Sequence, residues 1–160
     1  MRISFDIDDT LVIRNSSLPR ESGLLPGFLH KRFGEPLRQG TIELFRELHR
    51  RRCEIWIYTT SERTSWQIRR WLWLYGIQVA GIVNGEKHRK ALALCNPPLF
   101  ISKYPPAFNI DLHVDDSEGV KMEGDAKQFC VIVVKPDDEF WAEKVLNAVQ
   151  TFPSCKQTMS

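Results

Sequence analysis

Five short apolar runs, rich in β-branched and aromatic residues, constrain the fold of this chain more than any other feature. Each is long enough for a strand that is buried on both faces of a sheet. The runs span residues 2–5, 53–58, 79–83, 110–114 and 129–134. Between or after them lie helical patterns, at 41–51, 62–75, 86–94 and 138–150. This alternation predicts an α/β three-layer sandwich around a parallel five-stranded sheet, with the first strand in the centre.

The length of 160 residues fits a single domain, which we expect to cover residues 1–150, followed by a polar C-terminal tail over 151–160. The helix over 62–75 is expected to be capped by Thr60 or Ser61 and to stop at Gly76.

Residues 13–39 form an irregular insert in this pattern, rich in proline, glycine and serine. A loop of this length inside a domain is usually functional or mobile. We expect one short helix near 26–33, and a hairpin flap in which 11–14 pairs with 35–38. The basic residues of this region either contact an anionic substrate or are simply solvated. They are Arg14, Arg20, Lys31, Arg32 and Arg38.

Charge and composition narrow the class of protein. The chain has 22 basic and 20 acidic side chains, which is not the strongly basic balance of a dedicated nucleic-acid binder. No apolar segment is long enough to span a bilayer, and the N-terminal residues do not resemble a secretion signal. The four cysteines show no C-x-x-C spacing, so neither a zinc site nor a disulfide framework is expected. We therefore expect a cytoplasmic protein with no membrane partner.

Carboxylates gather where two of the expected strands end. Asp6 and Asp8 follow the first strand, and Asp115 and Asp116 follow the fourth. Ligands of open parallel sheets bind outside the carboxyl ends of the strands, and carboxylates crowded there repel one another unless a cation lies among them. Oxygen ligands of this kind suit Mg²⁺, which leaves other coordination positions to water and substrate phosphate. Asp9, in contrast, is expected to have a structural role.

The first of these segments resembles the first motif of the haloacid dehalogenase-like (HAD) superfamily of phosphohydrolases. That motif is an apolar strand followed by Asp-x-Asp-x-Thr, matched here by Asp6, Asp8 and Thr10. The second motif is a strand that ends in Ser or Thr, for which "IWIYTTS" offers Thr59 ahead of Thr60. The resemblance implies a Rossmann-like fold over about residues 1–150.

The remaining motifs follow in the order that the resemblance requires. The fourth motif, an apolar strand ending in paired acids, is matched by Asp115 and Asp116 in "HVDDS". The third is a lysine ahead of that strand, and three lysines are candidates. We favour Lys103, because a short connection leads from it into the fourth strand, over Lys87 and Lys90. Three motifs in order on three strands are much more specific than one Asp-x-Asp alone.

The resemblance implies a magnesium-dependent phosphatase rather than a dehalogenase, because the second acid of the first motif is present. Asp6 is implied as the nucleophile that forms an aspartyl-phosphate, and Asp8 as the acid and then the base. Thr59 is implied to bind a phosphoryl oxygen, and Lys103 to offset negative charge.

The implied metal ligands are the Asp6 side chain, the Asp8 backbone carbonyl and the Asp116 side chain, with Asp115 orienting them or adding to the negative field. Two other classes of function stay open. One is a phosphotransferase that passes the phosphoryl group to an alcohol, and the other is a non-catalytic module that binds phosphate or metal.

Members of this superfamily often carry a cap domain, for which this chain has little room. The expected substrate is therefore a phosphorylated small molecule or the phosphorylated end of a macromolecule, such as a phosphoprotein or a nucleic acid. In the helix over 62–75, Ile68, Leu72 and Tyr75 share one face. Trp66, Arg70 and Trp73 share another, which indicates a homo-oligomer interface, base stacking, or burial beneath 95–109.

Overall fold

The computed structural model describes residues 1–15, 17–23, 35–95 and 100–157. Its centre is a five-stranded sheet in the order β3-β2-β1-β4-β5, with every strand pair parallel. The strands are β1 (Arg2–Phe5), β2 (Glu54–Tyr58), β3 (Gly81–Val83), β4 (Leu112–Asp115) and β5 (Cys130–Val133). The helices are α2 (Thr41–Arg50), α3 (Ser65–Trp73), α4 (Gly85–Ala93), α5 (Glu118–Lys127) and α6 (Trp141–Gln157), with a short 3-10 helix, η1 (Pro105–Phe108). The prediction of an α/β three-layer fold with the first strand in the centre is confirmed.

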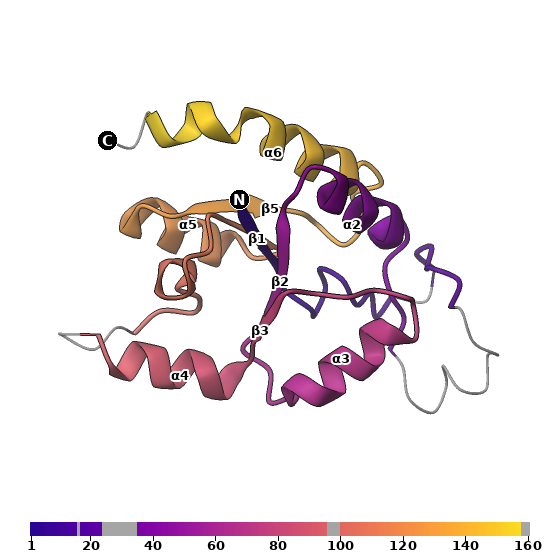
Figure 1. The fold of residues 1–160 in the computed structure, drawn as a ribbon, viewed down its shortest axis with the longest axis horizontal. Helices are drawn as coiled ribbons and strands as arrows, with labels where there is room; N and C mark the ends of the chain where they lie inside the picture. Colours follow the sequence, from indigo (N-terminus) through magenta and orange to yellow (C-terminus); the bar gives the residue numbers. More distant parts are fainter. Residues whose placement is uncertain (16, 24–34, 96–99, 158–160) are drawn as a thin grey trace.

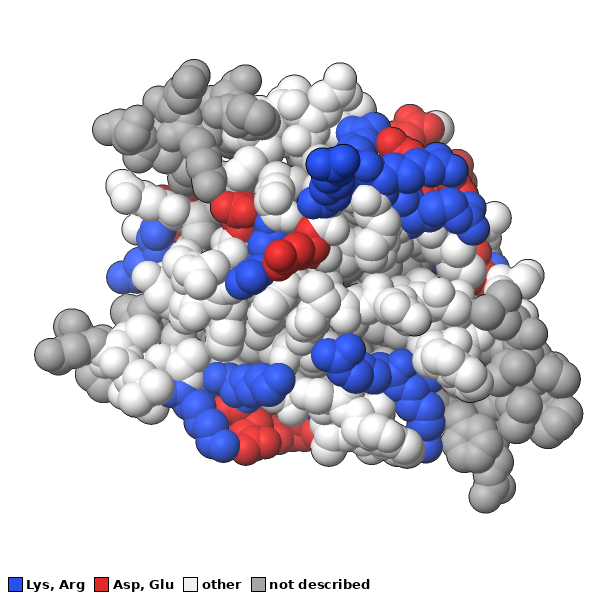
Figure 2. All heavy atoms as spheres, viewed as in Figure 1, with Lys and Arg blue, Asp and Glu red and all other residues white. Residues whose placement is uncertain are grey.

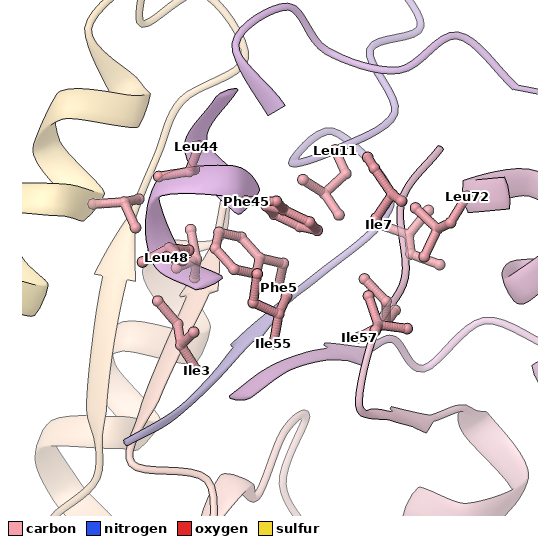
Figure 3. Close-up of a cluster of buried hydrophobic side chains, with 14 of the residues drawn as sticks. Ile3, Phe5, Ile7, Leu11, Leu44, Phe45, Leu48, Ile55, Ile57 and Leu72 are labelled. Carbon is pink, nitrogen blue, oxygen red and sulfur yellow. The ribbon is translucent and has the colours of Figure 1, made fainter. Parts of the chain in front are cut away.

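Helices cover both faces of the sheet, so that α2 and α3 lie on one side of β1, β2 and β3 and α4 and α5 on the other (Figure 1). Successive side chains of a strand point to opposite faces, which explains why every strand reads as apolar. Ile3 and Phe5 of β1 are fully buried in the core that also contains Phe45 and Leu48 of α2 (Figure 3). The Phe5 and Phe45 rings lie 4.8 Å apart between centroids. The larger part of the core therefore lies between α2, α3, α6 and the sheet.

The opposite face of the sheet carries polar side chains among its apolar ones. Ser4, Tyr58 and His113 are all fully buried there. Ser4 and His113 are register partners on the adjacent strands β1 and β4. Buried polar groups cost folding free energy unless they are hydrogen-bonded, so this face is where a polar site can be built.

Three helices differ from their sequence-based predictions. Helix α3 begins at Ser65 and is capped by Thr64, not by Thr60 or Ser61. The Thr64 hydroxyl accepts a hydrogen bond from the Gln67 amide, and the Gln67 side chain accepts one from the Thr64 amide, which is a reciprocal capping box.

Helix α5 was not predicted, because its two glycines and its few apolar residues leave no clear helical pattern in the sequence. Helix α6 begins later than expected and continues to Gln157, through part of the segment predicted as a tail.

The insert pairs with the chain that follows motif one. Val12 and Leu37 form an antiparallel bridge, and the Arg38 amide donates a hydrogen bond of 2.7 Å to the Leu11 carbonyl. The expected pairing of 11–14 with 35–38 is therefore present at these positions. The helix expected near 26–33, together with Lys31 and Arg32, lies outside the described residues.

Two parts of the surface bear on possible partners, namely the charged region over α2 and the aromatic face of α3. Over the region of α2, basic side chains lie beside acidic ones in the view of Figure 2. Arg50, at the end of α2, and Arg51, which caps it, both pair with Glu47 of this helix. On α3, Trp66 and Trp73 are 64% and 62% exposed, so that face is not buried beneath 95–109. Within the described ranges, no helix is both long enough and apolar enough to cross a membrane.

Candidate active site

The site lies at the carboxyl ends of the three central strands. β1 ends at Phe5, and the Asp6 amide then donates a hydrogen bond to the Val114 carbonyl of β4. This bond fixes Asp6 beside the end of β4, where Asp115 and Asp116 follow. On the other side of β1, β2 ends at Tyr58 and delivers Thr59. The parallel register therefore brings together residues that are about 50 and 110 positions apart in the chain.

Lys103 reaches into this acidic cluster from the connection before β4. Its Nζ lies 2.5 Å from Asp6 Oδ1 and 3.3 Å from Asp115 Oδ2, and it also donates to the Tyr58 carbonyl at 3.1 Å. The lysine is 4% exposed, and a buried ammonium needs this degree of pairing. Lys103 thus pairs with two of the carboxylates of the cluster, Asp6 and Asp115.

The other two lysines considered for this position lie elsewhere. The Lys87 ammonium donates to the Ile82 carbonyl at 2.8 Å, and Lys90 pairs with Glu86 on the exposed face of α4. Neither contact involves a residue of the acidic cluster. Of the three candidates, only Lys103 is brought to Asp6.

Asp115 is held by a buried hydrogen-bonded chain. His113 Nε2 lies 3.0 Å from Asp115 Oδ2, and His113 Nδ1 lies 2.8 Å from Ser4 Oγ. Burial lowers the pKa of His113, so the ring is neutral and carries one proton. Nε2 carries that proton toward the carboxylate, and the Ser4 hydroxyl donates to Nδ1. Burial by itself raises the pKa of Asp115. The hydrogen bond from His113 and the charge of Lys103 outweigh this effect and hold the pKa of Asp115 below its usual range.

Three carboxylates of the cluster are close enough to share a cation. One oxygen each of Asp6, Asp115 and Asp116 lies within 4.8 Å of the others. Burial raises the pKa of Asp6, against the effect of Lys103, and burial followed by repulsion from Asp115 raises the pKa of Asp116. Three acids face one ammonium here, so the cluster is short of positive charge. Its hard oxygen donors are those that Mg²⁺ prefers.

The side chain of Asp8 is not part of this set of carboxylates. Its Oδ1 accepts hydrogen bonds from Arg14 at 2.8 Å and from Arg63 Nη2 at 2.9 Å, and its Oδ2 accepts one from Arg63 Nη1 at 2.8 Å. The hydrogen bonds from Arg63, and then the one from Arg14, lower the pKa of Asp8. Arg63 also forms a two-point contact with Glu35, at 2.7 Å for both bonds. Asp8 is therefore an ionised carboxylate held by two guanidinium groups.

Thr59 follows the end of β2, and Asp9 lies in the turn after β1. The buried Thr59 donates its amide to the Val83 carbonyl, and its hydroxyl oxygen accepts the Ser61 amide at 3.2 Å. Thr60 is exposed. Asp9 has a φ of 57°, and its amide donates to the Val12 carbonyl, so it occupies a left-handed turn. Aspartate is among the residues that tolerate this conformation.

The structure adds three residues that sequence reasoning did not assign to the site, namely His113, Ser4 and Arg63. For the first two a signal was present, because each is the single polar residue in the interior of a buried strand. Two such residues at one register position of adjacent strands indicate a buried hydrogen bond. Arg63 gave no signal, since its partners lie 55 and 28 positions away in the chain.

Comparison with known proteins adds no further constraint. The chain matches no protein-family model, and searches of curated proteins and of solved structures also found no match.

Proposed function

We propose that this chain is a magnesium-dependent phosphatase of the haloacid dehalogenase-like type, which hydrolyses a phosphate monoester through a phosphorylated Asp6. The contact of 2.5 Å between Lys103 and Asp6, inside the cluster with Asp115 and Asp116, carries the proposal. Strand-end carboxylates with a buried counter-charge are costly to assemble, and such groups concentrate at functional sites.

In the first step, a carboxylate oxygen of Asp6 forms a bond to phosphorus while the bond from phosphorus to the ester oxygen breaks. Asp8, which is ionised while it pairs with Arg14 and Arg63, takes up a proton from solvent when it leaves them and gives that proton to the departing oxygen. Lys103 offsets the negative charge that gathers on Asp6 and the phosphoryl group, and Thr59 donates a hydrogen bond to a phosphoryl oxygen. The products are phosphorylated Asp6 and an alcohol.

In the second step, water attacks the phosphorus atom of phosphorylated Asp6. Asp8, now a carboxylate, takes a proton from this water. The bond between phosphorus and the Asp6 oxygen breaks, which releases inorganic phosphate and restores both carboxyl groups. For this cycle Asp8 must leave Arg14 and Arg63, with which it pairs in the free protein.

The residues present fit a magnesium ion. Its ligands would be the Asp6 and Asp116 side chains and the Asp8 backbone carbonyl, with Asp115 beside them. The three side-chain oxygens within 4.8 Å and the single Lys103 counter-charge support this assignment. When bound, Mg²⁺ neutralises phosphoryl charge and lets a carboxylate approach phosphorus. His113 and the Ser117 amide, which donates to Asp115 Oδ1 at 3.0 Å, hold Asp115 in orientation.

The proposal also covers the location of the protein in the cell and its association with other copies. We place the activity in the cytoplasm, which is supported by the free thiols of Cys53, Cys95 and Cys130 among the described residues. The exposed Trp66 and Trp73 are compatible with a subunit interface.

The test is magnesium-dependent release of phosphate from a panel of phosphorylated metabolites, phosphopeptides and oligonucleotides with terminal phosphates. Wild type is compared with Asp6→Asn, which keeps the shape of the side chain and removes the nucleophile. Asp125→Asn is the matched control, because this aspartate is 61% exposed and pairs with Lys121 on the surface of α5. We expect release by wild type and Asp125→Asn in the presence of Mg²⁺, and its loss in Asp6→Asn.

The other possible functions predict different results in this test. Release that survives in Asp6→Asn removes Asp6 from the role of nucleophile. Phosphate transfer that depends on an added alcohol identifies a phosphotransferase. Binding of phosphate or Mg²⁺ without turnover of any panel member identifies a non-catalytic module.

A further inference from the structure

Two arginines lie at the acid of the proposed mechanism and not at its nucleophile. The guanidinium groups of Arg14 and Arg63 together donate three hydrogen bonds of 2.8–2.9 Å to the two oxygens of Asp8. Lys103, in contrast, contacts Asp6. In the proposed reaction Asp6 faces phosphorus, whereas Asp8 faces the oxygen of the leaving group. Arg14 and Arg63 therefore lie on the leaving-group side of the site.

The two arginines come from different segments and are held to different degrees. Arg63, in the connection between β2 and α3, pairs with Glu35 as well as Asp8, and its carbonyl accepts a hydrogen bond from Asn84 at 3.1 Å. The Arg14 side chain is 70% exposed and forms an ion pair with Asp8. Arg63 is thus fixed in place, and Arg14 is free to follow a ligand.

The pairing with Asp8 does not by itself explain why two arginines are here. The Arg14–Asp8 pair is exposed, and exposed ion pairs contribute little to stability, commonly less than about 1 kcal/mol. Arg63, which is partly buried, already contacts both oxygens of Asp8. Guanidinium groups match the planar geometry of carboxylates and of phosphate oxygens. Asp8 can take part in proton transfer only after the guanidinium groups of Arg14 and Arg63 release its carboxylate. Another anion must then take the place of Asp8 as their partner. Glu35 already occupies the Nε and Nη2 edge of Arg63, so the anion that replaces Asp8 must come from outside the site.

We infer that Arg14 and Arg63 form a subsite for a second anionic group of the substrate. The substrate class is then a phosphate monoester whose leaving group carries a carboxylate or a further phosphate near the ester oxygen. This inference rests on the proposed function, which it deepens by naming the substrate class. Binding of the second anion draws both guanidinium groups away from Asp8 and releases that carboxyl group for the reaction. A phosphate monoester with an uncharged leaving group leaves the ion pairs in place.

The subsite is tested by binding, so that the result does not depend on turnover. Asp6→Asn protein with Mg²⁺ is titrated calorimetrically with two matched pairs of ligands. Phosphoglycolate is compared with hydroxyethyl phosphate, and the bisphosphate of propanediol with its monophosphate. The first pair isolates a carboxylate and the second a phosphate. We expect at least one of the doubly anionic ligands to bind about tenfold more tightly than its partner, as for a charge-assisted two-point contact.

Variants in the same Asp6→Asn background assign the preference to the arginines. Arg14→Gln is expected to reduce the binding ratio about fivefold to tenfold, and Arg14→Lys to retain part of it. Arg63→Gln, checked for folding by circular dichroism, is expected to act in the same direction. Arg46→Gln is the control, because this arginine pairs with Glu43 on the exposed face of α2, and the ratio is expected to stay unchanged in it.

Equal binding within both pairs, no binding of any of the four ligands, or a preference that survives Arg14→Gln and Arg63→Gln overturns the subsite. Phosphate release by the wild type on the same four ligands separates this inference from the proposed function. Release without preference overturns the subsite and leaves the phosphatase standing. Preferential binding without release, from these ligands or from any member of the substrate panel, supports the subsite and overturns the phosphatase.

Discussion

Lys103 Nζ lies 2.5 Å from Asp6 Oδ1, although 97 positions separate the two residues in the chain. The contact places one buried positive charge at the carboxylate that we propose as nucleophile. Without that charge, Asp6 and a phosphoryl group repel each other.

We expect Lys103→Gln to lower kcat/KM for phosphate release by about 10²- to 10³-fold, as for loss of one charged group that stabilises a transition state. Lys87→Gln is the matched control, since Lys87 contacts the Ile82 carbonyl instead of the acidic cluster, and it is expected to keep wild-type activity. The measurement is steady-state release of inorganic phosphate. Equal losses in the two variants remove Lys103 from its assigned role.

Magnesium is expected to stabilise the folded chain, because Asp6, Asp115 and Asp116 are close together only in that state. At Mg²⁺ concentrations about 100 times Kd, linkage predicts an increase in Tm of about 8 °C, which EDTA reverses. Asp116→Asn is expected to lose most of this increase, and Asp125→Asn to retain it. A thermal-unfolding series with and without Mg²⁺ measures the effect. An unchanged Tm in wild type at millimolar Mg²⁺ contradicts the metal site.

Asp6→Asn is expected to make the metal-free protein more stable. Burial raises the pKa of Asp6, so the ionised form costs folding free energy. The stability contributed by this group is full below its unfolded pKa and is lost as the pH rises through its folded pKa. At pH 7 in EDTA we therefore expect the variant to gain about 1 kcal/mol in free energy of unfolding, as is typical when an active-site charge is removed. Urea unfolding with Asp125→Asn alongside tests this, and a lower midpoint for Asp6→Asn argues against an excess of negative charge.

Asp8 is expected to have the opposite dependence on pH. The hydrogen bonds from Arg63 and Arg14 lower the pKa of Asp8. The contribution of Asp8 to stability is therefore present above its ordinary pKa of about 3.9 and is lost as the pH falls through the lower folded value. Wild type should exceed Asp8→Asn at pH 7 by about 1 kcal/mol at most, since solvent screens the pair. The measurement is the difference in free energy of unfolding between wild type and Asp8→Asn at pH 7 and near pH 3. We expect this difference to shrink in acid. A larger difference near pH 3 contradicts the stabilising ion pairs.

His113 is expected to couple Ser4 to Asp115 energetically. His113→Phe leaves the Ser4 hydroxyl without its acceptor and Asp115 without one donor, both in buried positions. We expect a loss of about 2–3 kcal/mol in free energy of unfolding. In a double-mutant cycle, Ser4→Ala should cost less in the His113→Phe background than in wild type. Fully additive losses are the result that excludes the hydrogen-bonded chain.

Much of this molecule follows from local patterns in the sequence. Apolar runs of strand length, separated by helical patterns, were sufficient to predict the parallel sheet, its central first strand and strand bounds within two residues of those observed. The side chains that end two neighbouring strands, Asp6 and Asp115, also follow from the sequence, because parallel strands end at a common edge. Such features depend on residues that are a few positions apart, which periodicity can register.

Other features were decided only by tertiary structure. Helix α5 forms without a clear apolar pattern because packing against β5 buries Val120 and Gly124. Lys103 meets Asp6, and Arg63 meets Asp8, across 97 and 55 positions. Lys87 and Lys90 carry the same charge as Lys103. The short connection into β4 favoured Lys103, but only the folded chain shows that it reaches Asp6. Such pairs form only where the folded backbone brings two charges together across a long stretch of chain. Burying either charge without its partner costs free energy, so the fold that pairs them is favoured over folds that do not.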